Sequence, residues 1–241
     1  MKKTFALFLI LLLLLPSCGG KIRLPDAEYS LSFSEEYLKL GGNSVKLMYP
    51  TISGYSDSAV ESTVNAAAAA IARQRYEEEG LMHDSDGGYT YTATDAAVTL
   101  ASRDFYSVYV IGVITSDVSG GRDTFAYTFN CDLTAASFVE AEDIITGYDA
   151  LAKKFQSDAF TADFGGDALE EQISKKSLIE QYKAAYGIYP YVYFSEGRFG
   201  ILTDTLPSIG QGCAGFSADI RDVRKYLQTD NPVIAALCGL E

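Results

Sequence analysis

The amino-acid sequence predicts an α+β fold: antiparallel sheets with helices packed on one face, arranged as two closely associated subdomains. Two observations lead to this prediction. Runs of alternating aromatic, β-branched and polar residues are joined by short turns, which is typical of antiparallel hairpins. The expected elements also come in blocks, in the order strand, helix, three strands, two helices, three strands, helix. No low-complexity linker interrupts the middle of the chain, so we expect the two halves to pack together.

The N-terminal half is expected to begin with residues 31–40 and, after a glycine-rich turn at 41–44, a strand over 45–49. A helix follows, because Ser58 and Glu61 have the spacing of a capping box. Its apolar stripe consists of Val60, Val64, Ala67, Ala68 and Ile71. Since most of these side chains are small, we expect this helix to lie close against a sheet.

Three strand-like runs then follow with short turns between them, which predicts an antiparallel meander over residues 89–102, 105–115 and 124–133. The pattern changes to helical spacing over 148–160 and 168–186. Strands are expected again over 189–194, 199–203 and 215–220, with a hairpin turn at 195–198, and a short helix over 221–227.

The first eighteen residues indicate where the protein is located. Lys2 and Lys3 precede an apolar run over 5–15, which is too short to span a bilayer and is typical of a secretory signal. Cys18 follows the small Ser17 and resembles the modified cysteine of a bacterial lipobox. We therefore expect cleavage before Cys18, acylation of its thiol, and an extracytoplasmic protein anchored to a bacterial membrane by lipid. An ordinary signal peptide with a chance cysteine is the alternative.

These observations divide the chain into four parts. Residues 1–17 are expected to be the signal peptide, and 18–44 the lipidated cysteine and a tether. Residues 45–133 are expected to form an N-terminal α+β module, and 134–241 a C-terminal α+β module.

The charge balance excludes one class of partner. The chain carries 19 basic and 32 acidic residues, a net charge of −13. Without Lys2 and Lys3, 17 basic residues remain and the net charge becomes −15. Such a surface repels nucleic acid, and favours a basic protein, a cationic ligand or a divalent metal. Acidity that only keeps a secreted domain in solution is the simpler alternative.

Acylation of Cys18 leaves Cys131, Cys213 and Cys238. One disulfide is compatible with an oxidising compartment, and Cys213 with Cys238 is the preferred pair because both flank the last segment. Three free thiols are the alternative. No spacing of Cys and His indicates a zinc site, and we predict neither a metal nor a cofactor.

Short phrases spread along the chain resemble one family in their order. They are MYPTISG (48–54), VN (64–65), YSV (106–108), FNCDLT (129–134), EDII (142–145), ADI (218–220) and VRKYL (223–227). This series is similar to the extracytoplasmic tandem modules of the DUF4163 and DUF3298 type, found in the anti-sigma factor RsiV and beside the catalytic domain of the peptidoglycan deacetylase PdaC. In RsiV-like proteins the region binds lysozyme outside the cell. The resemblance implies an envelope module, without their sigma-binding, transmembrane or catalytic parts. It assigns no site residue.

No catalytic residue stands out from the sequence. His83 is the single histidine and lies in a polar, glycine-rich stretch that has no nucleophile elbow and too few acidic ligands for a calcium loop. A pair of carboxylates could hydrolyse a glycan, but with 32 acidic residues the sequence does not single out a pair.

Three tyrosines alternate along one predicted strand: Tyr189, Tyr191 and Tyr193. Alternation places their rings on one face of that strand. If exposed, they would form a platform for a glycan or a protein; if covered by a helix, they would belong to the core. The function we expect is that of a lipid-anchored envelope module that binds a basic protein such as lysozyme, or peptidoglycan. An enzyme acting on cell-wall glycan and a structural envelope lipoprotein are the alternatives.

Overall fold

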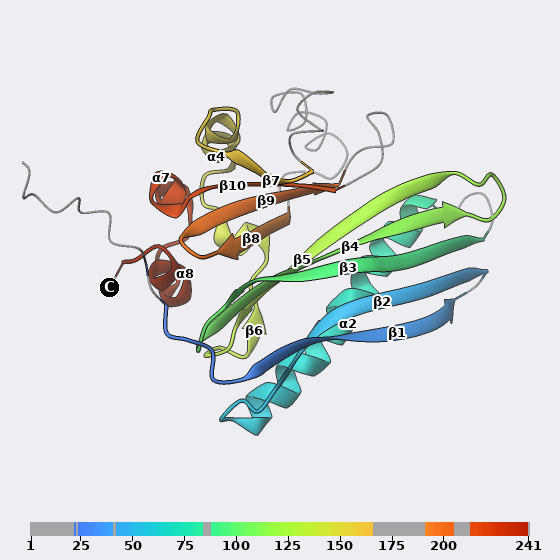
Figure 1. Ribbon diagram of the computed structural model, residues 1–241, viewed down its shortest axis with the longest axis horizontal. Coiled ribbons are helices and arrows are strands. Elements are labelled where there is room, and N and C mark those ends of the chain that lie inside the picture. The colour runs from blue at the N-terminus through green and yellow to red at the C-terminus, as the bar shows by residue number, and fades with distance from the viewer. Residues whose placement is uncertain are drawn as a thin grey trace, which may run out of the picture.

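The computed structural model describes residues 22, 24–40, 42–83, 88–165, 191–204 and 213–240 (Figure 1). Their strands form two sheets that pack together, the larger with six strands and the smaller with four. The predicted α+β class, with mostly antiparallel sheets in two associated subdomains, is confirmed. Within the described residues, no helix is both long enough and apolar enough to cross a membrane.

The first sheet has its strands in sequence order. They are β1 (Ser30–Leu40), β2 (Asn43–Ser53), β3 (Tyr89–Ala101), β4 (Phe105–Ser116), β5 (Arg122–Asp132) and β6 (Ser137–Phe138). The predicted meander corresponds to β3, β4 and β5, which pair antiparallel. The sheet also includes β1, so it begins inside the range expected to be a tether, and β6 extends it past the expected boundary at 133.

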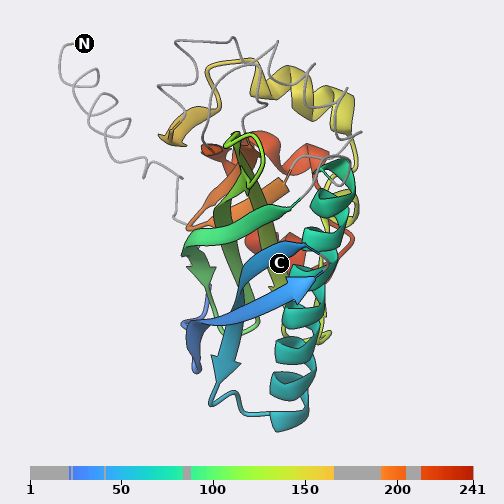
Figure 2. The same ribbon diagram turned by 90° about the vertical axis from the view of Figure 1, so that its right-hand side faces the viewer.

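One pair of strands departs from the antiparallel pattern. β2 and β3 run parallel, and the helix between them, α2 (Ser58–His83), makes the crossover. Figure 2 shows α2 along one face of the first sheet. Val64, Ala68 and Ala72 of α2 are completely buried. This confirms that small side chains let the helix approach the sheet closely.

The cap of α2 differs from the expected one. Asp57, not Ser58, accepts hydrogen bonds from the amides of Ala59 and Val60, at 2.9 and 3.3 Å. Glu61 reaches back to the amide of Tyr55 at 2.9 Å. The helix therefore starts with a carboxylate at its positive end, where an acid is more favourable than a hydroxyl.

The pairing of β2 with β3 is short. It covers only residues 44–46 and 90–92, after which the two strands diverge. Beyond this point, side chains form hydrogen bonds with the main-chain groups of β2 on the edge that no longer pairs with β3. The amide group of Asn65 on α2 accepts from Ile52 N at 2.8 Å and donates to Ile52 O at 2.9 Å, and Tyr127 donates to Met48 O at 2.9 Å. Pro50 lies between these positions and has no amide hydrogen to satisfy.

The second sheet has the order β7-β10-β9-β8. Its strands are β7 (Thr161–Phe164), β8 (Tyr191–Ser195), β9 (Arg198–Asp204) and β10 (Cys213–Asp219). The helices of this half are α3 (Ala141–Ile144), α4 (Tyr148–Phe155), α7 (Ile220–Val223), the 3-10 helix η1 (Arg224–Tyr226) and α8 (Pro232–Leu237). The predicted helix over 168–186 lies outside the described residues. The sequence did not predict α8, although Asn231 caps it and Pro232 occupies its first position.

A buried polar junction joins the two sheets. Ser107 on β4 donates to Asn130 on β5 at 2.8 Å, and Asn130 donates to Val192 O on β8 at 2.9 Å. Ser107 also accepts from Phe194 N at 2.9 Å. Because β8 is an edge strand of its own sheet, these side chains satisfy main-chain groups that have no neighbouring strand.

A cleft between the subdomains as candidate binding site

A cleft of about 640 Å³ opens where the two subdomains meet. It lies between the N-terminal segment, the end of β3, the β8–β9 turn and the helices α7 and α8. The large apolar residues in its lining are Ile22, Leu24, Leu100, Phe194, Ile220 and Leu237. Phe194, Ile220 and Leu237 are buried in the core of the C-terminal subdomain, so the apolar surface open to the cleft comes mainly from Ile22, Leu24 and Leu100. A cleft at a domain junction is a common place for a ligand.

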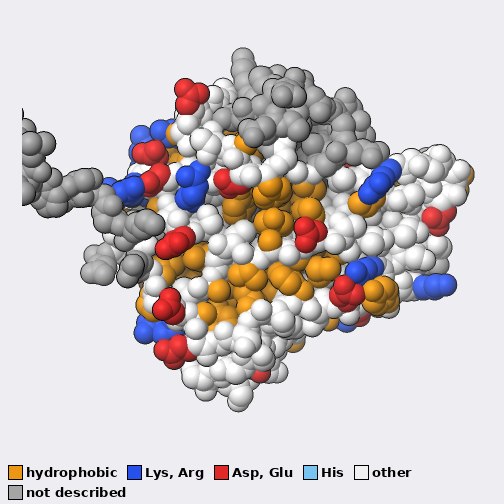
Figure 3. All heavy atoms as spheres, viewed as in Figure 1, with side chains coloured by type: hydrophobic (Ala, Val, Ile, Leu, Met, Phe, Trp, Pro, Cys, Tyr) orange, Lys and Arg blue, Asp and Glu red, His pale blue; other side chains and the backbone are white. Residues whose placement is uncertain are grey.

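Among the described residues, the two charged ones that line the cleft are acidic. Asp26 comes from the N-terminal segment and Glu196 from the β8–β9 turn, and both are exposed. The hydroxyl residues Thr99 and Ser195 lie with them. In Figure 3, hydrophobic side chains gather over this end of β3 and below the β8–β9 hairpin, with both acidic and basic side chains around them. The apolar and acidic residues that line the cleft itself suit a ligand that has both an apolar part and a positive charge.

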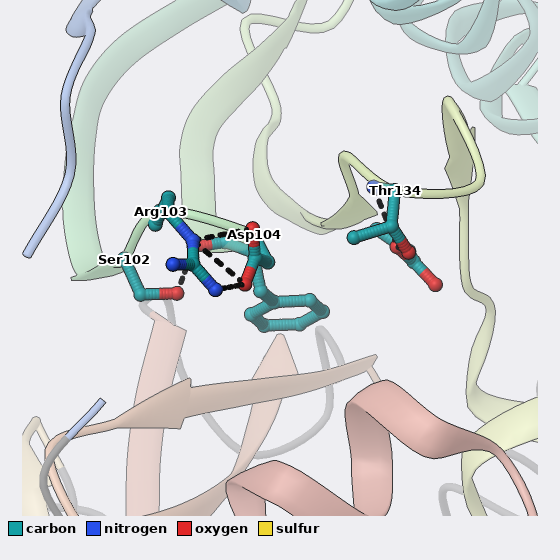
Figure 4. Close-up of polar contacts among 6 residues, drawn as sticks. Ser102, Arg103, Asp104 and Thr134 are labelled. Atoms are coloured by element: carbon teal, nitrogen blue, oxygen red, sulfur yellow. Dashed lines mark hydrogen bonds and ion pairs between the residues drawn. The ribbon is translucent and has the colours of Figure 1, made fainter. Parts of the chain in front are cut away.

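The N-terminal segment is held over the cleft by the turn between β3 and β4. The amide of Arg103 donates to Pro25 O at 3.0 Å, and Asp26 forms an isolated β-bridge with Ser102. Ser102 is buried, and both its amide and its hydroxyl donate to Phe105 O, at 2.8 and 2.9 Å. These bonds keep the turn tight, so they determine where the N-terminal segment crosses the end of β3 (Figure 4).

A second turn supports the first from the side of β5 (Figure 4). Leu133 N donates to Asp104 O at 2.9 Å. The carboxylate of Asp132 accepts from the amide and hydroxyl of Thr134, at 2.9 and 2.6 Å, as expected for an aspartate that closes a turn. Arg103 pairs with Asp104 at 2.8 Å, and this hydrogen-bonded guanidinium lowers the pKa of the Asp104 carboxyl.

The β8–β9 turn keeps Glu196 without a basic neighbour from its own hairpin. Gly197 adopts a φ of +69°, which lets the chain reverse tightly as predicted. Arg198 follows it but points to the second sheet, where it donates to the Ser217 hydroxyl at 2.7 Å and to Thr161 at 2.9 Å. The cleft therefore keeps its acidic character.

A glycosidase, one of the alternative functions, would need a general acid whose carboxyl pKa is raised. The described carboxyls whose pKa departs from its ordinary value are Glu35, Asp104 and Asp219, and in each the pKa is lowered by hydrogen bonds from a neighbouring Lys or Arg. No group of three or more His, Cys, Asp or Glu side chains in the described part could hold a metal ion.

Two of the three predicted tyrosines are among the described residues, and neither lines this cleft. Tyr189 lies outside the described residues. Tyr191 is half-buried, with the Arg75 guanidinium 5.7 Å from its ring centroid. Tyr193 is 2 % exposed, lies over Gly200, and donates its hydroxyl to Asp163 at 2.5 Å. The ring of Tyr193 is thus part of the core and is not presented to a ligand.

The three cysteines among the described residues are free thiols. Cys238 is buried among the residues that pack behind the second sheet, whereas Cys213 packs with Tyr109 and Tyr193 between the sheets and donates to Phe125 O at 3.5 Å. The expected pair of Cys213 with Cys238 is therefore not bonded here. Cys131 is completely buried.

Several residues singled out in the sequence cannot be placed. Cys18 and residues 84–87 lie outside the described residues, and His83 is the last residue of α2, with its side chain not described. Conversely, the cleft residues carry no signal in the sequence. They come from five separate segments, and only folding brings Asp26 and Glu196 to one opening.

Comparison with known proteins gives a likeness in structure only. No protein-family model matches the sequence, and no curated protein matches it. A crystal structure of a DUF3298 family member from Bacteroides fragilis is similar, with a TM-score of 0.50 and 13 % identity over 88 % of this chain and 98 % of that one. A DUF3298 family protein from Pseudomonas aeruginosa has a TM-score of 0.44 and 11 % identity, over 86 % of this chain and 95 % of that one. At such low identity the first likeness shows the fold alone, and the chain has a DUF3298-type fold.

Proposed function

We propose that this chain is an extracytoplasmic, lipid-anchored module that binds a basic protein through the cleft between its subdomains. The observation that carries the proposal is the composition of that cleft. Ile22, Leu24 and Leu100 are half-buried and offer apolar surface, and among the described residues the charged side chains lining the cleft are Asp26 and Glu196. A lysine or arginine of the ligand would pair with these carboxylates, while a neighbouring apolar side chain would cover Leu24 and Leu100.

The overall charge acts in the same direction. A net charge of −13 attracts a basic partner over distances longer than direct contact and accelerates its association. The alternative function, that of a structural envelope lipoprotein, would need one large exposed apolar patch for contacts with other proteins. Among the described residues, the large hydrophobic side chains that are markedly exposed are Tyr37, Val98, Val118 and Leu240, which come from separate elements.

The position of the proposed anchor relates the cleft to the membrane. Cys18 precedes Ile22 by four residues, a length of chain that spans at most about 14 Å. Ile22 lines the cleft and contacts the chain at Gly239, just after α8. Figure 1 shows the first described residues beside α8. An acylated Cys18 would therefore hold the mouth of the cleft close to the membrane surface.

A pull-down tests the binding function. The mature protein is immobilised and exposed to hen lysozyme, a small basic protein, at low salt and at about 0.5 M salt, where charges are strongly screened. We expect capture at low salt and its loss at high salt. Absence of capture at low salt, or capture that is unchanged by salt, would contradict the proposal.

Matched variants test the cleft itself. The double variant Asp26→Asn with Glu196→Gln removes both carboxylates of the cleft, and we expect binding to weaken at least about fivefold. The control, Glu77→Gln with Asp158→Asn, removes the same charge from exposed positions elsewhere. If both double variants weaken binding equally, the overall charge and not the cleft is responsible.

The anchor has a separate test. In a bacterial host, the unmodified chain is expected in the membrane fraction, and Cys18→Ser in the fraction released without detergent. Metabolic labelling with an alkyne-bearing fatty acid should mark the unmodified chain only. Release of the unmodified chain without detergent would contradict lipid anchoring.

A further inference from the structure

A second groove lies at the opposite end of β3 from the cleft. It has a volume of about 540 Å³ and is formed by the end of β1 and the beginnings of β2 and β3. These are the residues where β2 and β3 still pair, just before the strands diverge. The groove and the cleft share no lining residue, so the two can be occupied independently.

Tyr37 offers an exposed aromatic ring in this groove. It is 70 % exposed, although tyrosine usually covers part of its ring against neighbouring side chains. Its hydroxyl donates to Glu35 at 2.8 Å, and the Lys46 ammonium lies 5.9 Å from the ring centroid. Lys46 also pairs with Glu35 at 2.7 Å. The ring is therefore oriented before any ligand arrives, which reduces the entropy lost on binding.

The charged residues that line the groove are basic, on a chain whose net charge is −13: they are Lys39 and Lys46. Two acids lie beside the groove. Glu35 is paired with Lys46, and Asp117 accepts a hydrogen bond from the Thr90 hydroxyl at 3.2 Å. Ser44 and Thr92 add hydroxyl groups to the lining. A second copy of this chain is a poor occupant, because two strongly acidic molecules repel each other.

We propose that this groove binds a glycan chain that carries carboxylates. The C–H face of a sugar ring is apolar and carries a slight positive potential, so it packs well on the negative face of an exposed tyrosine. Lys39 and Lys46 would pair with carboxylates of the glycan, and Ser44 and Thr92 would bond its hydroxyls. This inference relies on the extracytoplasmic location in the proposed function, but not on the cleft or its ligand.

Calorimetry with two soluble glycans tests this site. The probes are uncross-linked peptidoglycan strands, in which alternate sugars carry a lactyl group that leads to carboxylates, and chitohexaose, a neutral chain of the same linkage. We expect the acidic strands to bind at least about fivefold more tightly than chitohexaose at low salt, and this difference to shrink as salt rises. Equal binding of both probes, or no binding of either, would overturn the proposal.

Variants then assign the binding to the groove. Tyr37→Ala is expected to weaken binding of the acidic strands about tenfold, which corresponds to about 1.4 kcal/mol. Tyr37→Phe keeps the ring and is expected to stay within about twofold, while Lys39→Gln loses several-fold. Val118→Ala, at an exposed residue between β4 and β5, is the matched control.

The outcomes separate this site from the cleft. If Tyr37→Ala binds the strands as tightly as the unmodified protein, the groove is not the glycan site. If Tyr37→Ala instead changes the sedimentation coefficient of the protein, a second copy occupies the groove and the proposal is overturned. The cleft double variant, Asp26→Asn with Glu196→Gln, is expected to bind the strands normally, whatever its effect on lysozyme.

Discussion

Ser107 on β4 and Asn130 on β5 lie directly opposite each other, and their side chains are joined by a hydrogen bond of 2.8 Å in the buried junction between the two sheets. Together they bond both Phe194 N and Val192 O on β8. Phe194 also lines the cleft. The pair therefore does more than stabilise the first sheet, because it sets the position of the β8–β9 hairpin and hence the shape of the candidate binding site.

Ser107→Ala tests this junction. The substitution leaves the amide of Phe194 buried without its acceptor, and we expect the free energy of unfolding to fall by about 1–3 kcal/mol. Urea denaturation of the mature protein measures it. Ser53→Ala changes an exposed serine at the end of β2 and should cost no more than about 0.5 kcal/mol. Equal losses in the two variants would show that the junction contributes nothing.

Asn65→Ala tests the edge of β2. The Asn65 side chain makes the two hydrogen bonds that a neighbouring strand would make with Ile52. Without it, Ile52 N and O lose their partners, and we expect a loss of about 1–3 kcal/mol in stability, with faster hydrogen exchange at the Ile52 amide. Thr63→Ala on an exposed position of α2 is the control and should not lower stability. Unchanged exchange at Ile52 would argue against this role.

Asp219→Asn tests a pH-dependent contribution. Hydrogen bonds from the Arg221 side chain lower the pKa of the Asp219 carboxyl from its ordinary 3.8 to about 2. Because the folded-state pKa lies below the unfolded value, the ion pair stabilises the protein above about pH 4, and this contribution disappears as pH falls toward 2. Asparagine keeps the acceptor for Arg221 N, which caps α7, but removes the charge. We expect the variant to lose stability less steeply between pH 4 and 2, and an unchanged slope would contradict this.

The burial of the thiols lets us predict how fast each one reacts. Burial raises the pKa of Cys131 to about 12 and that of Cys238 to about 11, so both remain protonated and inaccessible near neutral pH. We expect a thiol reagent at pH 8 to modify these two slowly in the folded mature protein, and all free thiols rapidly in denaturant. Mass spectrometry of the alkylated protein locates the sites. A peptide containing Cys213 bonded to Cys238 would instead establish the disulfide that the sequence favoured.

Local patterns were enough to predict most of the strands. The β-branched, aromatic and polar residue types over β3, β4 and β5, with short turns between them, identified the meander, because these signals depend only on neighbouring residues. The turn at Gly197 was predicted for the same reason, since a glycine at positive φ acts locally. The cap at Asp57 also depends only on local residues, but the capping-box spacing of Ser58 and Glu61 led to the prediction that Ser58 was the cap.

The tertiary structure decided what depends on residues far apart in the chain. The parallel pairing of β2 with β3, the burial of Tyr193 and the contact of Asn130 with Val192 each join segments that the sequence separates. The cleft is the clearest case, because Asp26 and Glu196 become neighbours of one opening only after both sheets have packed. The sequence by itself determined most of the strands, the helix α2 and the acidic charge, and it predicts the anchor at Cys18. Packing decided which side chains became core and which remained available to a ligand, because burial is a property of the assembled fold and not of any single segment.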